Sequence, residues 1–203
     1  MTNKPSTWEE IAQKERTQWR RVIYASLNPV ETMVKLDSLI DYLYNQTDFF
    51  YAPASTKYDA AYPGGLSRHS RFLTGILIQL TKAGVCNTWE RSESPIIIGM
   101  LHDITKTGCY VVTEDCSGQH PCYTYNTDRV ELSEIHGEDS LLKAQKFTDL
   151  TEEESACIRW HMGAYETAAW DELDQAIRQF PNVIWTHTAD MVASKGLEKT
   201  DAK

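Results

Sequence analysis

The chain has 203 residues and a formal net charge of −9 at pH 7. This length suits one full hydrophobic core, and 41% hydrophobic with 24% charged residues is the balance of a globular protein, which excludes a disordered or fibrous chain. The acidic balance disfavours duplex nucleic acid as a partner, because nonspecific binding depends on neutralising its phosphates with basic side chains.

The chain lacks the apolar segments that export or membrane insertion requires. Its first ten residues include two glutamates, and its longest apolar run, over 96–101, is too short to cross a bilayer. We therefore expect a cytoplasmic protein without membrane contact. Its five cysteines are predicted to be reduced thiols, and a structural zinc bound by Cys109, Cys116, His120 and Cys122 is the minor alternative.

Helical patterns dominate the first half of the chain. Residues 1–48 predict two helices with apolar residues at the spacing of one helix face. A loop over 49–65, rich in Tyr, Pro, Ala, Ser and Gly, leads to a helix over 66–83. The Ser94-Pro95 pair predicts a further helix, with the serine as N-cap and the proline as first residue. The apolar run that follows indicates that this helix is buried nearly all round.

The pattern changes once in the second half. Tyr-Val-Val-Thr and Tyr-Thr-Tyr flank Ser117-Gly118 and predict a β-hairpin inserted at about 109–125. Helices are predicted again over about 137–146, after a capping box that begins at Thr151, and over about 181–195.

These elements predict a single all-α domain over 1–203 with a small hairpin insertion. Its N-terminal helices occupy 1–48, its helical core 49–195 and its C-terminal tail 196–203.

Histidines and aspartates recur on the helices that are otherwise apolar. A single buried histidine is usually a core residue that bonds a backbone carbonyl, but six such groups together need another reason, because burying them is costly unless they are paired or bind metal. The six residues are His69, His102, Asp103, His136, His161 and Asp190. Four imidazoles and two carboxylates suit two divalent transition-metal ions such as Fe, Mn, Zn, Ni or Co, whereas Mg²⁺ and Ca²⁺ prefer oxygen ligands.

The order of these residues resembles the H…HD…H…H…D signature of the HD superfamily in its two-metal form. The motifs that carry the resemblance are Tyr62-Pro-Gly-Gly-Leu-Ser-Arg-His69, Leu101-His-Asp-Ile-Thr-Lys106, His136-Gly-Glu-Asp-Ser140 and Arg159-Trp-His-Met-Gly163. The resemblance covers roughly residues 49–195 and extends to small, uncharacterised bacterial and phage HD hydrolases. It implies an HD-domain helical bundle.

The resemblance also implies a division of the ligands. One metal would be bound by His69, His102, Asp103 and Asp190, and the other by Asp103, His136 and His161. Asp103 would bridge them, since a carboxylate has two oxygens and can hold two ions roughly 3.5–4 Å apart.

Basic residues near these motifs are candidates for binding phosphate. Lys106 lies three residues beyond Asp103, and we predict that it holds the substrate phosphate or stabilises the leaving group. Further candidates are Arg68, Arg71, Arg129 and Lys195.

The predicted function is therefore that of a metal-dependent phosphohydrolase acting on a nucleotide or another small phosphate ester, with Asp103 and Lys106 as its catalytic residues. A mixed-valent di-iron oxygenase of the HD type is the first alternative, because it uses the same six ligands. A 3′-exonuclease or phosphodiesterase is the second, since Ala61-Tyr-Pro-Gly-Gly-Leu66 resembles the HD domain of a bacterial exoribonuclease family. A non-catalytic nucleotide-binding module is the third.

Two smaller questions stay open on the sequence alone. His187 precedes Asp190 by three residues and either orients that carboxylate or packs between helices. Tyr110, Tyr123 and Tyr125 either fill local packing or line a pocket mouth, where they would stack on a base or sugar.

Overall fold

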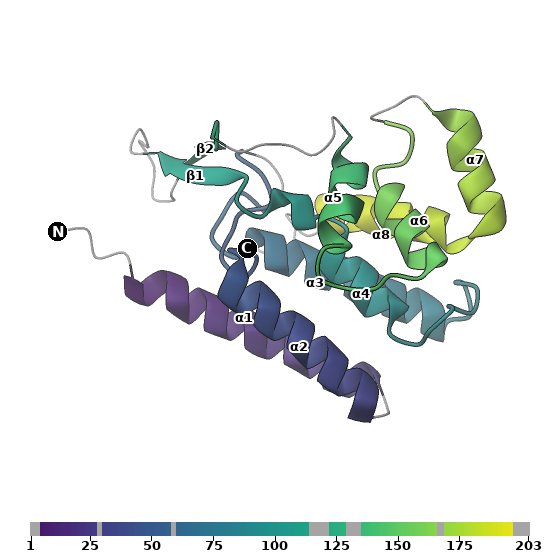
Figure 1. Ribbon diagram of the computed structural model, residues 1–203, viewed down its shortest axis with the longest axis horizontal. Coiled ribbons are helices and arrows are strands. Elements are labelled where there is room, and N and C mark those ends of the chain that lie inside the picture. Colours follow the sequence, from purple (N-terminus) through teal and green to yellow (C-terminus); the bar gives the residue numbers. More distant parts are fainter. Residues whose placement is uncertain are drawn as a thin grey trace. The chain divides into compact units, whose positions relative to one another are not determined.

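Eight α-helices and one β-hairpin make up the part of the chain that the structure describes (Figure 1). This structure is a computed structural model, and it describes residues 5–27, 30–57, 60–113, 122–128, 135–165 and 169–196. The predicted all-α class with a small hairpin insertion is confirmed. None of the described helices combines the length and the apolar character needed to cross a bilayer.

The elements follow the chain in a simple order. The helices are α1 (Pro5–Ser26), α2 (Val30–Gln46), α3 (Gly65–Lys82), α4 (Ser94–Leu101), α5 (His136–Ala144), α6 (Glu152–Arg159), α7 (Trp170–Gln179) and α8 (Asn182–Gly196). A 3₁₀ turn, η1 (Ile104–Lys106), and the strands β1 (Tyr110–Thr113) and β2 (Cys122–Tyr125) lie between α4 and α5.

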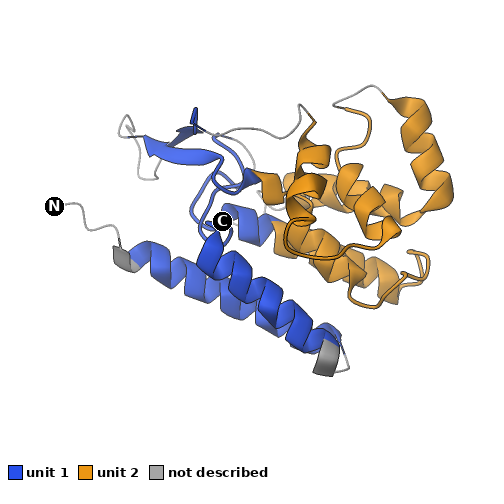
Figure 2. Ribbon diagram, viewed as in Figure 1, with its two compact units in different colours: residues 1–69, 106–129 blue, residues 70–105, 130–203 orange. Residues whose placement is uncertain are grey.

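The chain divides into two compact units, coloured separately in Figure 2. Unit 1 comprises residues 1–69 and 106–129, and unit 2 comprises 70–105 and 130–203. Helix α3 continues from the first unit into the second. The organisation of the whole chain as one domain stays a prediction.

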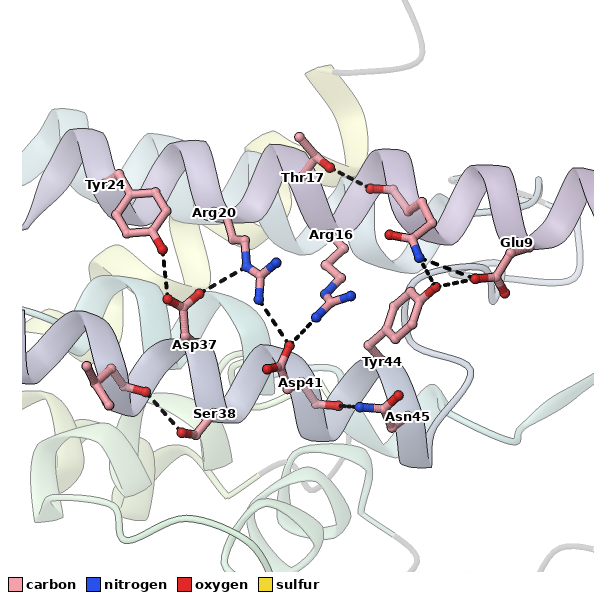
Figure 3. Close-up of polar contacts among 12 residues, drawn as sticks. Glu9, Arg16, Thr17, Arg20, Tyr24, Asp37, Ser38, Asp41, Tyr44 and Asn45 are labelled. Carbon is pink, nitrogen blue, oxygen red and sulfur yellow. Dashed lines mark hydrogen bonds and ion pairs between the residues drawn. The ribbon is translucent and has the colours of Figure 1, made fainter.

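In unit 1, α1 packs against α2 through apolar and charged residues. Trp19 and Ile23 of α1 are fully buried. Arg20 reaches Asp37 and Asp41 of α2, with nitrogen–oxygen distances of 3.1 Å to each carboxylate (Figure 3). Because these ion pairs are partly exposed, they contribute little stability, and burial of the apolar face holds the two helices together.

The hairpin of unit 1 is antiparallel, and Tyr110 pairs with Tyr125 while Thr113 pairs with Cys122. The predicted turn at Ser117-Gly118 lies outside the described residues. The cysteine expectation needs a correction. Cys86, Cys109 and Cys157 are free thiols, but Cys122 is in a disulfide.

The minor alternative, a structural zinc at the hairpin, is wrong for the same reason. Zinc binds the thiolate form of cysteine, and a disulfide sulfur of Cys122 is not a thiolate. Of the other three residues of that alternative, Cys109 is buried as a free thiol, and Cys116 and His120 lie outside the described residues.

Unit 2 is built around α4, whose eight residues are all buried. Helix α6 packs against α4, α5 and α8, and α7 packs against α8. Helix α7 was not predicted from the sequence, and none of its residues is completely buried. Its half-buried Leu173, Ala176 and Ile177 contact the core, as does Phe180 at its C-cap. The helical spacing of these residues is the signal that would have identified the helix.

Candidate metal centre

The end of α4 supplies two neighbouring ligands from the interior of unit 2. His102 is the C-cap of this helix, and its backbone N–H donates to the carbonyl of Ile98. Its side chain is completely buried, and that of Asp103 is 3% exposed. Burial on this scale is costly for a carboxylate unless a cation or several donors face it.

The start of α4 is tied to α6 by a buried carboxylate. Ser94 was predicted as the N-cap of α4, but Glu93 occupies that position and Pro95 is the second helical residue. The Ser94 hydroxyl instead donates to Glu154 of α6 at 2.8 Å. Arg91 donates to both oxygens of the same carboxylate, at 2.8 and 2.5 Å. The long-range bonds to Glu154 therefore override the local capping preference of the serine.

Helix α6 begins as predicted and delivers His161 just beyond its last residue. Thr151 and Glu154 form a capping box, in which each side chain accepts a hydrogen bond from the other's backbone N–H. At the other end, Gly163 adopts a positive φ of 65°, which glycine tolerates without strain. A Cβ there would lie 2.9 Å from the ring of His187, so this glycine also makes room for that histidine.

Helix α5 places His136 close to the end of α6, and Gly137 allows the approach. A Cβ on Gly137 would lie only 2.1 Å from the backbone oxygen of Arg159. Gly99 plays a similar part between α4 and α3, where a Cβ would lie 1.8 Å from Oγ1 of Thr74. Both contacts require a residue without a side chain.

Asp190 comes from α8, whose first residue is anchored to α6. The amide of Asn182 donates to Glu153 at 2.9 Å, and its oxygen accepts from the backbone N–H of Asn87 at 2.9 Å. Glu153 also accepts from the backbone N–H of Glu90 at 3.0 Å. Burial raises the pKa of Glu153, and these donors compensate for part of that cost.

The two oxygens of Asp103 face different ligands. Oδ1 lies 2.6 Å from Nε2 of His136 and 3.5 Å from Nε2 of His161. Oδ2 lies 3.5 Å from Nε2 of His102, and that nitrogen lies 3.7 Å from Oδ1 of Asp190. Asp103 thus stands between one pair of imidazoles and a separate imidazole–carboxylate pair.

Backbone carbonyls fix the tautomers of two of these histidines. Nδ1 of His102 lies 3.0 Å from the carbonyl of Gly99, and Nδ1 of His161 lies 2.7 Å from that of Ile158. A carbonyl only accepts, so Nδ1 donates in both rings, and the neutral ring keeps its lone pair on Nε2. These lone pairs face carboxylate oxygens, an arrangement that needs a cation to be favourable.

The buried Nε2 of His161 is the atom that most directly indicates a cation-binding site. It has no hydrogen-bond partner among the described residues, although Asp103 lies close by. The His161 ring also meets those of His102 and His136 edge to face, with centroids 5.0 and 5.4 Å apart. Such an unsatisfied nitrogen, surrounded by further nitrogen and oxygen donors, fits a transition-metal site.

Two groups of three residues have ligand atoms that all lie within 4.8 Å of one another. Asp103, His136 and His161 form one group, and His69, His102 and Asp103 form the other. His69 is buried on α3, directly before the residue at which that helix enters unit 2. The protein therefore has a buried cluster of histidines and aspartates that could bind metal.

The cluster is closed on most sides and most accessible at His136. Its side chain is 23% exposed, against 12% for Asp190 and none for His102 and His161. Burial lowers the pKa of His102. Burial also acts to lower the pKa of His161, but the nearby carboxylates of Asp103 and Asp190 outweigh that effect and raise it.

Two further residues, His187 and Asp139, lie close in sequence to ligands of the cluster. His187 bonds the backbone carbonyl of His161 through Nδ1 at 2.7 Å, so it supports the segment that carries a ligand. Asp139 is buried on α5, and its Oδ1 has no hydrogen-bond partner among the described residues. It lies three residues after His136, a spacing that puts both on one helix face.

The predicted phosphate-binding residues remain candidates. Lys106 is half-buried at the end of η1 in unit 1, and its catalytic role stays a prediction. Arg68 and Arg71 are half-buried on α3, and Lys195 is exposed on α8. Arg129 lies outside the described residues.

Comparisons of the chain with protein-family models, with curated proteins and with solved structures find no match.

Proposed function

We propose that this chain is a metal-dependent phosphohydrolase that binds two divalent transition-metal ions and hydrolyses a nucleotide or another small phosphate ester. The observation that carries the proposal is the division of ligands about Asp103. One oxygen of this carboxylate faces His136 and His161, and the other faces His102, as a bridging carboxylate between two ions requires.

The donor set supports transition metals over Mg²⁺ or Ca²⁺. Imidazole nitrogens outnumber carboxylate groups in it, and nitrogen donors suit Fe, Mn, Zn, Ni or Co, whereas the harder cations prefer oxygen. When bound, such a pair of ions polarises phosphoryl oxygens and lowers the pKa of a coordinated water. His69 and Asp190 would complete the set on the His102 side of Asp103.

The residues of the chain itself would orient the ligands and control access. The carbonyls of Gly99 and Ile158 hold two imidazoles so that Nε2 faces Asp103, and this preorganisation lowers the cost of assembling the site. Substrate would enter on the side of His136, whose ring is the most exposed of the three. Lys106 would hold the phosphate or stabilise the leaving group.

The test begins with metal content and turnover in the same preparation. The protein is purified anaerobically, loaded in turn with Fe(II), Mn(II) or Zn(II), and its metal content is measured by elemental analysis. Phosphate release is then followed with phosphomonoesters, phosphodiesters and nucleoside triphosphates, while an oxygen electrode records any consumption of O₂. We expect about two ions per chain and release of phosphate without use of O₂.

An Asp103→Asn variant tests the central residue, with Asp174→Asn on the exposed face of α7 as its matched control. Asp103→Asn should lose metal, and its turnover should fall by several orders of magnitude, whereas Asp174→Asn should behave like the wild type. Full hydrolysis by Asp103→Asn would refute the mechanism. Consumption of O₂ without phosphate release would assign the cluster to the di-iron oxygenases, which use the same ligands.

A further inference from the structure

A pocket of about 330 Å³ lies within unit 1 and is lined mainly by aromatic side chains. Trp8 comes from α1, Tyr51 from the loop after α2, and Tyr110 and Tyr123 from the two strands of the hairpin. Asp48, also from the loop after α2, lies in the same wall. This volume is at the lower end of the range for small-molecule sites, which indicates a compact ligand.

The strand register explains why two tyrosines share one wall. Tyr123 pairs directly with Val112 across the hairpin, so their side chains lie on the same face. Tyr110 lies two residues before Val112 and therefore points to that face too. Tyr125 pairs with Tyr110, and their rings lie 5.5 Å apart, but Tyr125 is 63% exposed and is not among the residues that line the pocket.

Hydrogen bonds and ring contacts hold these walls in place. Oδ1 of Asp48 accepts from the backbone N–H of Gly108 at 2.9 Å, and the Asp48 carbonyl accepts from the N–H of Tyr51 at 2.9 Å. The rings of Trp8 and Tyr51 meet edge to face, with centroids 5.9 Å apart. The pocket is therefore preformed, which reduces the entropy that a ligand loses on binding.

The electrostatics of the pocket select the sign of the ligand's charge. Asp48 is the one charged side chain among the described residues that line it. Burial raises the pKa of Tyr51 and Tyr123, so both phenols stay neutral. Aromatic faces are electronegative, and together with one carboxylate they attract a cation and repel a phosphate.

One wall residue also has an unsatisfied polar group. The hydroxyl of Tyr123 is buried and has no hydrogen-bond partner among the described residues. Leaving such a group unpaired is costly, and unpaired buried groups in a pocket wall are expected where a ligand or water completes the bonding.

We propose that this pocket binds a small organic cation, namely an alkylated ammonium group seated against Trp8, Tyr51, Tyr110 and Tyr123 and balanced by Asp48. Aromatic walls around one acidic side chain suit an ammonium with apolar substituents, which loses little hydration and gains cation–π contacts. The proposal goes beyond the phosphohydrolase function and does not depend on it, because it concerns binding in unit 1 alone.

The experiment measures binding to the full-length protein by titration calorimetry and ligand-observed NMR. The probes are tetramethylammonium, choline, the neutral isostere of choline in which a quaternary carbon replaces the nitrogen, and adenosine. We expect both cations to bind and choline to bind at least about tenfold more tightly than its isostere. Equal affinity for the isostere, binding of adenosine alone, or no binding at millimolar concentrations would each overturn the proposal.

Substitutions then locate the binding. Asp48→Asn keeps an oxygen for the N–H of Gly108 and removes the charge, so it should weaken choline binding about fivefold to tenfold. Trp8→Ala should weaken it about tenfold. Asp128→Asn, on the exposed surface of the same unit, and Trp170→Ala, on α7, are the matched controls and should bind as the wild type does. Unchanged affinity in both Asp48→Asn and Trp8→Ala, with folding confirmed by circular dichroism, would also overturn the assignment.

Discussion

The close approach of α5 to the end of α6 makes Gly137 a sensitive probe of the metal centre. An alanine Cβ would lie 2.1 Å from the backbone oxygen of Arg159 and 3.0 Å from its carbonyl carbon. A backbone group cannot rotate away as a flexible side chain can, so α5 must move by about 1 Å to relieve the contact. His136 is the first residue of α5 and would move with it.

Two effects of opposite sign decide the stability of Gly137→Ala. Replacing glycine by alanine within a helix gains about 1 kcal/mol, and overpacking a tight contact costs about 1–3 kcal/mol. The backbone clash places the cost near the upper end, so we expect a net loss of about 1–2 kcal/mol. Gly75→Ala on α3 is the matched control, because nothing lies within 4 Å of its Cβ, and it should gain about 1 kcal/mol.

Thermal unfolding followed by circular dichroism measures this difference. For a chain of this length, each kcal/mol corresponds to about 2–4 °C in Tm, so Gly137→Ala should melt about 5–10 °C below Gly75→Ala. Zinc titration should also show weaker binding to Gly137→Ala alone, since only that variant displaces a ligand. A Gly137→Ala protein that melts with Gly75→Ala and binds zinc as the wild type does would refute the close packing of α5 on α6.

Three other expectations concern buried charges, thiols and catalysis. Glu154→Ala should lower the free energy of unfolding in urea by about 3 kcal/mol, because it leaves the partly buried guanidinium of Arg91 without its partner. Asp174→Ala, which removes an exposed ion pair, should change it by at most about 0.5 kcal/mol. Equal losses in the two variants would contradict this ranking. Burial raises the pKa of Cys86 and Cys157, so at pH 8 few of these thiols are thiolates, and iodoacetamide should label them only after unfolding. Mass spectrometry of protein treated in its folded state measures this labelling, and rapid labelling of Cys157 would contradict the prediction. Lys106→Ala should keep its metal content and lose phosphate release, and loss of metal instead would show that its role is structural.

The sequence predicted most helices of the fold because their signals are local. The capping box at Thr151 and Glu154 placed the start of α6 correctly, and the apolar run after Pro95 placed a fully buried α4. Local signals were misleading where contacts between distant residues determine the structure. Ser94 has the local character of an N-cap, but its hydroxyl bonds Glu154, sixty residues further along the chain.

The candidate ligands could be predicted as a set, but their arrangement could not. Their order along the chain indicated that His102, Asp103, His136 and His161 act together, and the structure brings them within a few ångströms of one another. The division of imidazoles between the two oxygens of Asp103 depends on how closely the helices approach. That approach is set by glycines whose neighbours are remote in sequence, and so no local pattern reports it.

The same reasoning explains why Glu153 and Glu154, which are not ligands, matter to the centre. Glu154 joins the start of α6 to the start of α4, and Glu153 joins α6 to the first residue of α8. These three helices deliver His161, His102 and Asp190, and α6 is the common partner of the other two. Because each bond is made by a buried carboxylate with several donors, a shift of one helix would leave a buried charge unsatisfied, at a cost of several kcal/mol. These bonds hold the helices in register, so the binding free energy of an ion at the candidate centre would go into its coordination and not into ordering the chain.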